Sequence, residues 1–441
     1  MRHNLKALFT GALLLLSVLS FGSATKIQFA EYTLENGLHV ILHEDKTTPN
    51  IVVNIMYHVG SKNEHPERTG FAHFFEHLMF EGSKHIARGE FSEIVEGAGG
   101  ALNAFTSFDV TNYYVMLPSN QLELGLWLES ERMLHPVIDS IGIATQKDVV
   151  TEEMKQTRDN PPYGRLLIET ISRAYTDHPY RWDVIGADPH IRNATDEDIE
   201  NFHKMFYVPD NAVLVITGDI DIETTKPLVE KYFGDIPKGT MAQRVPEITK
   251  RKLTAEVRDT VYDNIQIPAL VKAYKIPELG HDDYYAVDML NSLLSRGQSS
   301  RLYRRLVDEE QKSLQVMAMP LGLEHPGITL VFALANMGID VKDIEASINE
   351  EIARVRNEMI SENDLQKLKN QIESRMVNSN STIAQRATNL ANYHTIYGNA
   401  TLVNTHLERY MRVTREDIKR VANEYFTEDN RVVLYWLPKA Q

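Results

Sequence analysis

Two histidines and a glutamate occupy five positions of an otherwise apolar stretch at residues 70–83, GFAHFFEHLMFEGS. On a helix, His73 and His77 lie one turn apart on the same face, so both imidazoles can bind one metal ion. Two nitrogen ligands at this spacing suit zinc. Glu76 is rotated by about 100° from His77 and can reach a metal-bound water without binding the metal itself. The pattern His-x-x-Glu-His, an inverted form of a common zinc-protease motif, therefore predicts metal-assisted hydrolysis.

A catalytic zinc needs three protein ligands and an open position, so the third ligand must come from another segment. The chain has no cysteine, which leaves His, Asp and Glu as possible ligands. Residues 146–154 form an acid-rich helical pattern that ends before Pro161 and Pro162, and they offer Glu152 and Glu153. The residues alone leave both glutamates open as the third ligand.

No other histidine stands in such a context in the sequence, and we assign none of them a role. These include His58, His203, His281 and His394.

The elements that must position these residues follow from the apolar periodicity. Asn36-Gly37 lies between two alternating segments within residues 32–44, which is a hairpin signal. Helices are expected over 67–80, 89–97, 119–134 and 144–158, and strands over 51–59, 103–117 and 212–217. Strands that interleave with helices without regular βαβ spacing favour an α+β fold, a sandwich with a mainly antiparallel sheet covered by helices.

An internal repeat indicates two such units. Residues 195–199, TDEDI, recur as residues 414–418, TREDI, and both copies lead into an Asp-Asn turn and a β-branched strand. The offset between the copies is 219 residues, which is the size of a duplicated domain rather than of a short repeat. We therefore expect a signal peptide at 1–24, a zinc-binding catalytic domain at 25–236, a linker at 237–253 and a homologous non-catalytic domain at 254–441.

The N-terminus has the three-part pattern of a secretory signal peptide. Arg2 and Lys6 precede an apolar run at 7–19, which is short for a bilayer span, and the small residues 22–24 follow as a cleavage site. We expect export, to the periplasm or as a secreted protein, and no stable membrane insertion after cleavage. The alternative is an uncleaved anchor.

The net charge of −15 argues against nucleic-acid binding, which depends on Lys and Arg to neutralise phosphates. The basic cluster at 250–252 lies beside Pro246 and Gly239, and we interpret it as the solvated face of the linker.

The zinc motif, the trailing Phe80-x-Gly82-Ser83 and a glutamate separated from the second histidine by 75 residues resemble the pitrilysin/insulinase family of inverzincin metallopeptidases. The length and the single pair of repeats are similar to the processing-peptidase branch of that family. The match continues through residues 100–104, 178–180, 207–211, 218–219 and 297–302.

The resemblance implies a zinc endopeptidase with one Zn²⁺ per chain, held by His73, His77 and Glu153, with Glu76 as the general base. It also implies that the two domains face each other around a chamber. The segment with Asn103 and Ala104 would form the sheet edge that pairs with an extended or unfolded peptide substrate.

The second half lacks a matching site. Aligning Gly82 with Gly297 places Asp288, Asn291 and Ser292 where His73, Glu76 and His77 stand, and Asn and Ser replace neither a base nor an imidazole. The second half is therefore expected to be non-catalytic.

Three further positions depart from the family pattern. The family uses an arginine and a tyrosine to hold the substrate carbonyl, and Val307 and Leu314 occupy the matching positions. Neither side chain can donate a hydrogen bond. A family acid seven residues before the third ligand is replaced by Gln146, which can orient the site only through hydrogen bonds.

Two classes of function follow. The first is a zinc endopeptidase completed by a partner, either a homologous non-catalytic subunit in a heterodimer or a second copy of this chain. The second is a non-catalytic peptide-binding or assembly subunit, as some relatives of this family are. The complete set of His73, Glu76, His77 and Glu153 favours the enzyme.

Overall fold

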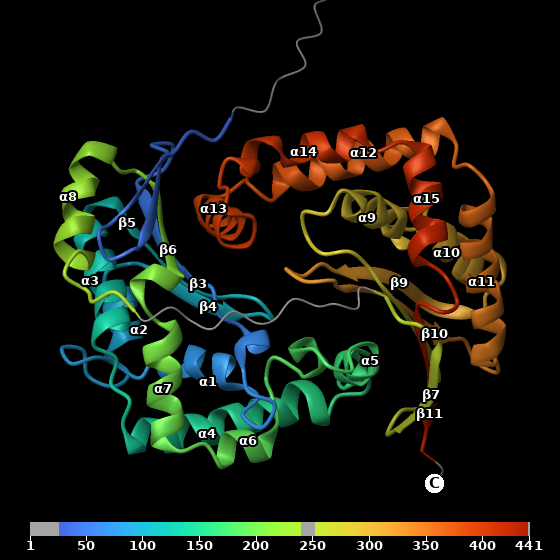
Figure 1. Cartoon of the computed structure of the whole chain (residues 1–441), viewed down its shortest axis with the longest axis horizontal. Helices are drawn as coiled ribbons and strands as arrows, with labels where there is room; N and C mark the ends of the chain where they lie inside the picture. The colour runs from blue at the N-terminus through green and yellow to red at the C-terminus, as the bar shows by residue number, and fades with distance from the viewer. Residues whose placement is uncertain (1–25, 240–251, 440–441) are drawn as a thin grey trace, which may run out of the picture.

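The computed structural model describes residues 26–239 and 252–439, which form two halves that each contain one sheet with helices packed against it (Figure 1). The expected signal peptide at 1–24 and most of the expected linker at 237–253 lie outside the described residues, so the domain boundaries stay predictions. In the described part of the chain, every helix is too short or too polar to cross a membrane.

The first sheet has six strands. In spatial order they are β1 (Ala30–Thr33), β2 (His39–Glu44), β6 (Ala212–Gly218), β3 (Asn50–Tyr57), β5 (Thr111–Pro118) and β4 (Ala101–Thr106). All neighbours are antiparallel except β2 and β6. The hairpin expected at Asn36-Gly37 joins β1 to β2, and Gly37 there has the positive φ of 94° that this turn requires.

The single strand expected over 103–117 is wrong, because this segment forms the hairpin of β4 and β5. The turn carries no Asn-Gly or Gly-Gly signal. Ser107 makes it instead, because its hydroxyl accepts hydrogen bonds from the N–H groups of Asp109 and Val110 at 3.2 and 3.0 Å.

The helices of the first half are α1 (Phe71–Leu78), α2 (Glu90–Gly97), α3 (Leu122–Leu134), α4 (Ser140–Met154), α5 (Leu166–Ala174), α6 (Asp188–Arg192), α7 (Asp196–Phe206) and α8 (Ile222–Phe233). The helix expected over 144–158 begins earlier, because Asp139 caps α4 by accepting a hydrogen bond from the Gly142 N–H at 2.8 Å. After Met154 it continues as a π-helical turn at Lys155–Asp159.

The second sheet has five strands, in the order β7 (Val257–Asp263), β11 (Arg431–Pro438), β8 (Ala269–Lys275), β10 (Ile328–Ala335) and β9 (Ser313–Leu321), and only β7 and β11 are parallel. Its helices are α9 (Asp282–Ser295), α10 (Arg301–Tyr303), α11 (Val341–Asn357), α12 (Glu362–Asn378), α13 (Ile383–Tyr397), α14 (Leu402–Arg412) and α15 (Arg415–Tyr425). Thr195 and Thr414 both cap their helices with capping boxes, so the two copies of the repeat fold in the same way. The prediction of two domains, each with a mainly antiparallel sheet covered by helices, is confirmed, and the chamber between them stays a prediction.

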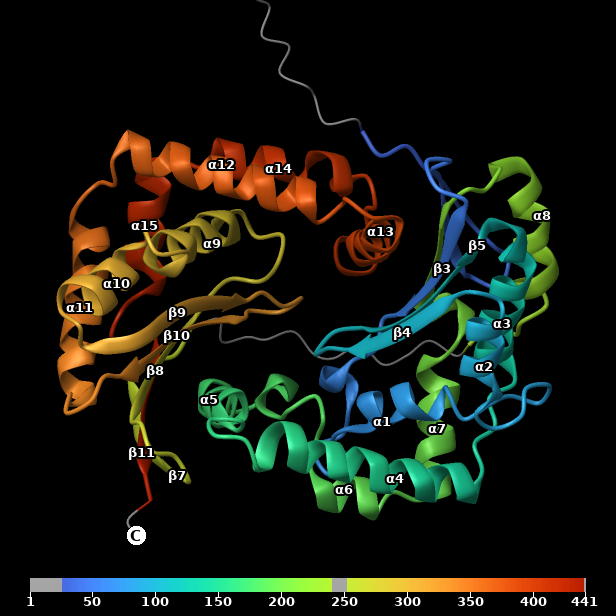
Figure 2. The ribbon, with the colours of Figure 1, turned by 180° about the vertical axis from the view of Figure 1, so that it is seen from behind.

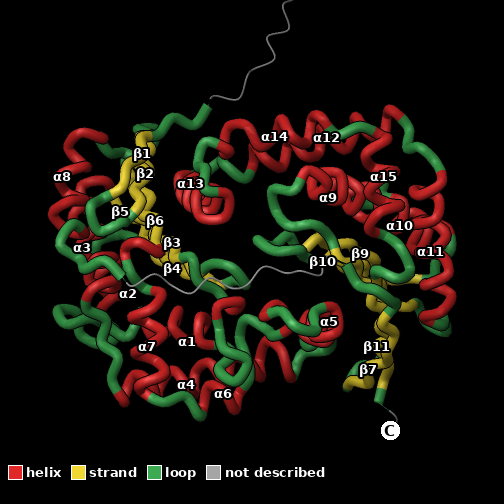
Figure 3. The backbone as a smooth tube through the Cα atoms, viewed as in Figure 1, coloured by secondary structure: helices red, strands yellow, loops and turns green. Residues whose placement is uncertain are grey.

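One helix of each half packs against the sheet of the other half. Most helices of each half lie on the side of its sheet away from the other half (Figure 3). The opposite face of the first sheet is covered by α13 of the second half, where Ala387 and Leu390 pack against Val52 and Val215. In return α5 of the first half packs its Ile171 on the second sheet. Figures 1 and 2 show both helices between the sheets.

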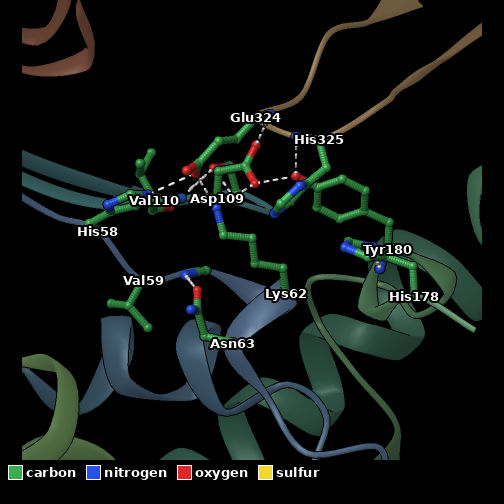
Figure 4. Close-up of polar contacts among 12 residues, drawn as sticks. His58, Val59, Lys62, Asn63, Asp109, Val110, His178, Tyr180, Glu324 and His325 are labelled. Carbon is green, nitrogen blue, oxygen red and sulfur yellow. Dashed lines mark hydrogen bonds and ion pairs between the residues drawn. The ribbon is translucent and has the colours of Figure 1, made fainter. Parts of the chain in front are cut away.

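A buried polar cluster also joins the halves, where the β4–β5 turn meets the β9–β10 turn (Figure 4). The Lys62 ammonium forms ion pairs with Asp109, at 2.9 Å, and with Glu324 of the second half. His58 lies 2.7 Å from the same Glu324 carboxylate, and the Tyr180 hydroxyl donates a hydrogen bond to Asp109. These contacts hold the end of β4, and thus the strand beside α1, against the second half.

Candidate metal centre

The helix that carries the zinc motif begins at a sharp turn. Gly70 has a φ of 91°, and a Cβ there would lie 2.6 Å from the carbonyl oxygen of Ile185. The buried Glu64 carboxylate accepts hydrogen bonds from the backbone N–H groups of Gly70, at 2.8 Å, and Ala72, at 2.9 Å. It therefore satisfies two of the N–H groups that a helix N-terminus leaves free.

Glu64 gives no signal in the sequence, because it stands six residues before Gly70, outside the usual capping positions. The Glu64→Gln variant is expected to lose about 1–3 kcal/mol of unfolding free energy, because the amide has one acceptor oxygen for two buried N–H donors. Urea unfolding followed by circular dichroism measures this loss. Glu67→Gln on the exposed surface nearby is the control and should change stability by less than about 0.5 kcal/mol. Equal effects of the two variants would contradict the capping role.

The predicted ligands converge. The apolar side of α1 is buried in the core of the first half, while His73 and His77 face the end of α4. His77 Nε2 lies 3.2 Å from Oε2 of Glu153, and His73 Nε2 lies 3.6 Å from Oε1 of the same carboxylate. Donors bound to zinc at 2.0–2.2 Å in a tetrahedron are about 3.3–3.6 Å apart, so these two nitrogens and one carboxylate fit a zinc ion. Glu152 instead pairs with Lys155 at the exposed surface.

The charge state of the cluster also suits a metal. Burial, and after it the neighbouring His77, lowers the pKa of His73 to about 4, and Glu153 opposes this shift. The hydrogen bond from His77 lowers the pKa of Glu153. A neutral His73 imidazole and a Glu153 carboxylate are the forms that bind zinc. The second nitrogen of His73, Nδ1, is buried without a hydrogen-bond partner in the described part of the chain.

Glu76 lies beside this cluster without being part of it. Its carboxylate accepts a hydrogen bond of 2.6 Å from the Thr106 hydroxyl, which fixes the side chain between α1 and β4. Burial raises the pKa of Glu76, and the hydrogen bond from Thr106 opposes this rise. Sequence reasoning missed Thr106, although the period of two along β4 puts it on the same face as Ala104.

Asn103 and Ala104 lie on β4, at the edge of the first sheet. Within the described residues β4 pairs only with β5, so its other side is open to a further strand. Ala104 faces the core with Thr106, whereas Asn103 is exposed on the opposite face. The strand beside Glu76 is thus available for pairing, but the Asn103 side chain points away from Glu76.

Gln146 contacts none of the three predicted ligands through a hydrogen bond in the described structure. Its amide donates a hydrogen bond of 2.5 Å to Glu81, four residues after His77. Glu81 in turn pairs with Arg88 at 2.6 Å. Gln146 therefore ties α4 to the segment that follows α1.

The second half contains no comparable cluster in its described residues. Asp288, at the position equivalent to His73, pairs with Arg375 at 2.5 Å and accepts a hydrogen bond from Tyr410. Asn291 accepts a hydrogen bond from Thr329 at 2.7 Å. These side chains are buried on α9 and serve the packing of the second half.

Val307 and Leu314 offer no donor to the site. Val307 packs against the core of the second half, and Leu314 is 51% exposed on the edge strand β9. The arginines nearby already face carboxylates: Arg301 faces Asp364, Arg304 faces Glu309, and Arg305 faces Glu310, Glu350 and Glu351. They belong to α10 and the turn after it, which pack on α9 and α11 away from α1 (Figures 1 and 2).

Comparisons with known proteins agree with this geometry. The family model described as Insulinase (Peptidase family M16) matches residues 39–187, and that described as Peptidase M16 inactive domain matches residues 193–372. The zinc protease PqqE of Helicobacter pylori is 30% identical over 409 residues, which are 92% of each chain. The uncharacterized zinc protease YmxG of Bacillus subtilis is 25% identical and covers 91% of this chain and 97% of its own.

Solved structures show the same fold. The crystal structure of a protease from Helicobacter pylori superposes with a TM-score of 0.88 at 29% identity, over 93% of this chain and 100% of that chain. A putative M16-like peptidase from Alicyclobacillus acidocaldarius reaches 0.80 at 22% identity, over 94% and 99% of the two chains, a likeness of fold alone.

Proposed function

Because the chain belongs to the insulinase family of zinc peptidases, we propose that it is a zinc-dependent endopeptidase that hydrolyses extended or unfolded peptides. The observation that carries this proposal is the convergence of His73, His77 and Glu153 from two helices, with Glu76 held beside them by Thr106. A subunit that only binds peptides has no need of a buried carboxylate next to three ligands.

In this mechanism His73, His77 and Glu153 hold one zinc ion, which, when bound, polarises the scissile carbonyl and lowers the pKa of water. The Glu76 carboxylate accepts a proton from the attacking water and delivers it to the leaving amine. Burial, which raises the pKa of Glu76, suits a group that must both accept and release a proton. The Thr106 hydroxyl keeps the carboxylate in place for both steps.

The substrate would bind as an added strand along β4, through backbone hydrogen bonds at Asn103 and Ala104. Such pairing requires an extended peptide, so a folded protein would be a poor substrate. The open edge of β4 beside Glu76 supports this arrangement. The space between the halves would form the chamber in which the peptide is cut.

We further propose that the chain is exported, to the periplasm of a bacterium or beyond it, on the pattern of residues 1–24. A homologous subunit or a second copy would supply the carbonyl donors that Val307 and Leu314 lack. The same two positions support the second candidate function, a non-catalytic peptide-binding subunit. For this candidate, a peptide-binding or assembly subunit, no peptide should be cut with any partner, whether or not zinc is bound.

The double variant His73→Ala, His77→Ala is expected to bind one zinc ion fewer than the wild-type chain and to lose all peptide hydrolysis. Isothermal titration of the metal-free proteins with ZnCl₂, together with cleavage of an unstructured peptide, measures both. His65→Ala at the exposed surface is the control and should match the wild-type chain in both properties. As many zinc ions in the double variant as in the wild-type chain, or cleavage by the double variant, would refute the assignment of the ligands.

A further inference from the structure

A second cluster of metal-ligating side chains lies far from α1, where the two halves meet. Glu31 on β1 and His39 on β2 belong to the first half, and His394 on α13 belongs to the second. The described residues contain two groups of three donors within 4.8 Å of one another, the candidate zinc centre and this one. The sequence gives no hint of it, because His39 and His394 are 355 residues apart.

The two imidazole rings are unusually close. Their centroids lie 3.6 Å apart and their planes are inclined by 15°. His39 Nε2 lies 3.2 Å from Oε2 of Glu31. The other ring nitrogen of His39, Nδ1, lies 3.1 Å from the Thr33 hydroxyl. A histidine that binds a metal through one nitrogen usually has such a partner on the other, which fixes its tautomer.

The charges at the cluster favour a cation. Two imidazoles stack beside one carboxylate. In the described part of the chain, Glu31 forms an ion pair with His39 and none with a lysine or arginine. Two neutral nitrogens and one anionic oxygen form a ligand set that first-row divalent metals prefer.

We propose that Glu31, His39 and His394 form a second metal site, for a divalent first-row transition metal of which Zn²⁺ is the probe. The metal replaces the proton between His39 Nε2 and Glu31, and His39 Nδ1 then donates to Thr33. Because the two rings are nearly parallel, His394 would turn about its side-chain bonds to direct a nitrogen at the metal and supply the third ligand, and water completes the coordination on the side of the exposed Glu31. The separation of 3.2 Å between the nitrogen and oxygen of the first pair already matches zinc ligands.

This site would be structural. Its ligands come from the β1–β2 hairpin of one half and from the exchanged helix α13 of the other. A bound metal would therefore hold α13 against the first sheet and stabilise the contact between the halves. The site is independent of the proposed peptidase activity.

The test uses the double variant His73→Ala, His77→Ala as its background, because this variant lacks the two histidine ligands on α1. Isothermal titration with ZnCl₂ is expected to show one zinc per chain in this background, and the thermal unfolding midpoint should rise with zinc concentration. Adding His394→Gln should weaken zinc binding by at least about 100-fold. Even residues that only hydrogen-bond to a metal ligand change the metal affinity by 10–100-fold. Adding Glu31→Gln, which keeps the shape of the side chain, should weaken it by at least about tenfold.

The chain offers a matched control. His85 and His135 are also neighbouring rings beside a glutamate, Glu131, but their ligand atoms and those of Glu131 do not form a group of three within 4.8 Å. Because these donors do not converge, His135→Gln should leave zinc binding in the background unchanged.

Crystals of the wild-type protein soaked in ZnCl₂ provide a measurement that needs no variant to fold. An anomalous difference peak is expected about 2.0–2.2 Å from Glu31, His39 and His394. No zinc binding in the background, binding that His394→Gln does not weaken, or no peak at the cluster would overturn the proposal and leave the stacked histidines as a packing contact.

Discussion

Replacing Glu76 by glutamine is expected to leave zinc bound and to reduce peptide hydrolysis by about 10²–10⁴-fold. The amide has nearly the shape of the carboxylate, and its oxygen can still accept the hydrogen bond from Thr106. It cannot accept the proton of the attacking water, so the loss should fall on turnover rather than on substrate binding. Steady-state cleavage of a fluorogenic unstructured peptide, with zinc measured on the same samples, separates the two effects.

Glu96→Gln, on the exposed side of α2 in the same half, is the control and should keep full activity. Turnover of Glu76→Gln within a few-fold of the wild type would show that another group takes the proton. Loss of zinc together with activity would mean that Glu76 acts mainly on the structure of the site.

The pure chain is expected to be a weak peptidase that becomes efficient only with a partner, either a homologous subunit or a second copy of the chain. A hydrogen-bond donor aimed at the developing oxyanion is commonly worth about 3–4 kcal/mol, or roughly 10²–10³ in turnover. Val307 and Leu314 supply none, and Arg305 is held by three carboxylates. Adding the partner should therefore raise turnover of an unstructured peptide by about 10²-fold or more.

The measurement compares turnover by the chain alone, its mass checked by light scattering, with turnover after the candidate partner is added. A neighbouring reading frame that encodes a similar chain without His-x-x-Glu-His, but with the arginine and tyrosine, is the first partner to test. The variants Arg301→Gln and Arg304→Gln should leave the activity of the pair unchanged. Full activity of a homogeneous preparation without the partner would contradict this requirement and direct attention to these two arginines.

Local patterns predicted the parts of the site that lie close together in sequence. The spacing of His73, Glu76 and His77 on one helix, and the repeat at Thr195 and Thr414, need only helical periodicity and capping chemistry. The support of the site could not be predicted in this way. Thr106 reaches Glu76 across 30 residues, and Glu64 caps α1 from outside the usual positions.

Contacts between distant parts of the chain were the least predictable. The β4–β5 hairpin was missed because its turn is made by a serine hydroxyl instead of a glycine. The cluster at His39 and His394 depends on packing between elements at opposite ends of the chain, which no local period encodes. Single-sequence patterns describe elements well and their long-range partners poorly.

The exchange of helices has a consequence for how the chain is made. The last strand of the first sheet ends at Gly218, but α13, which covers the face that includes Val52 and Val215, begins at Ile383. A ribosome that adds about 5–20 residues each second needs roughly 8–30 seconds to reach it. Throughout that time the nascent first half exposes an apolar sheet surface to water. This face of the first sheet therefore stays uncovered until translation is almost finished, and a chaperone that binds apolar strands has that interval in which to act.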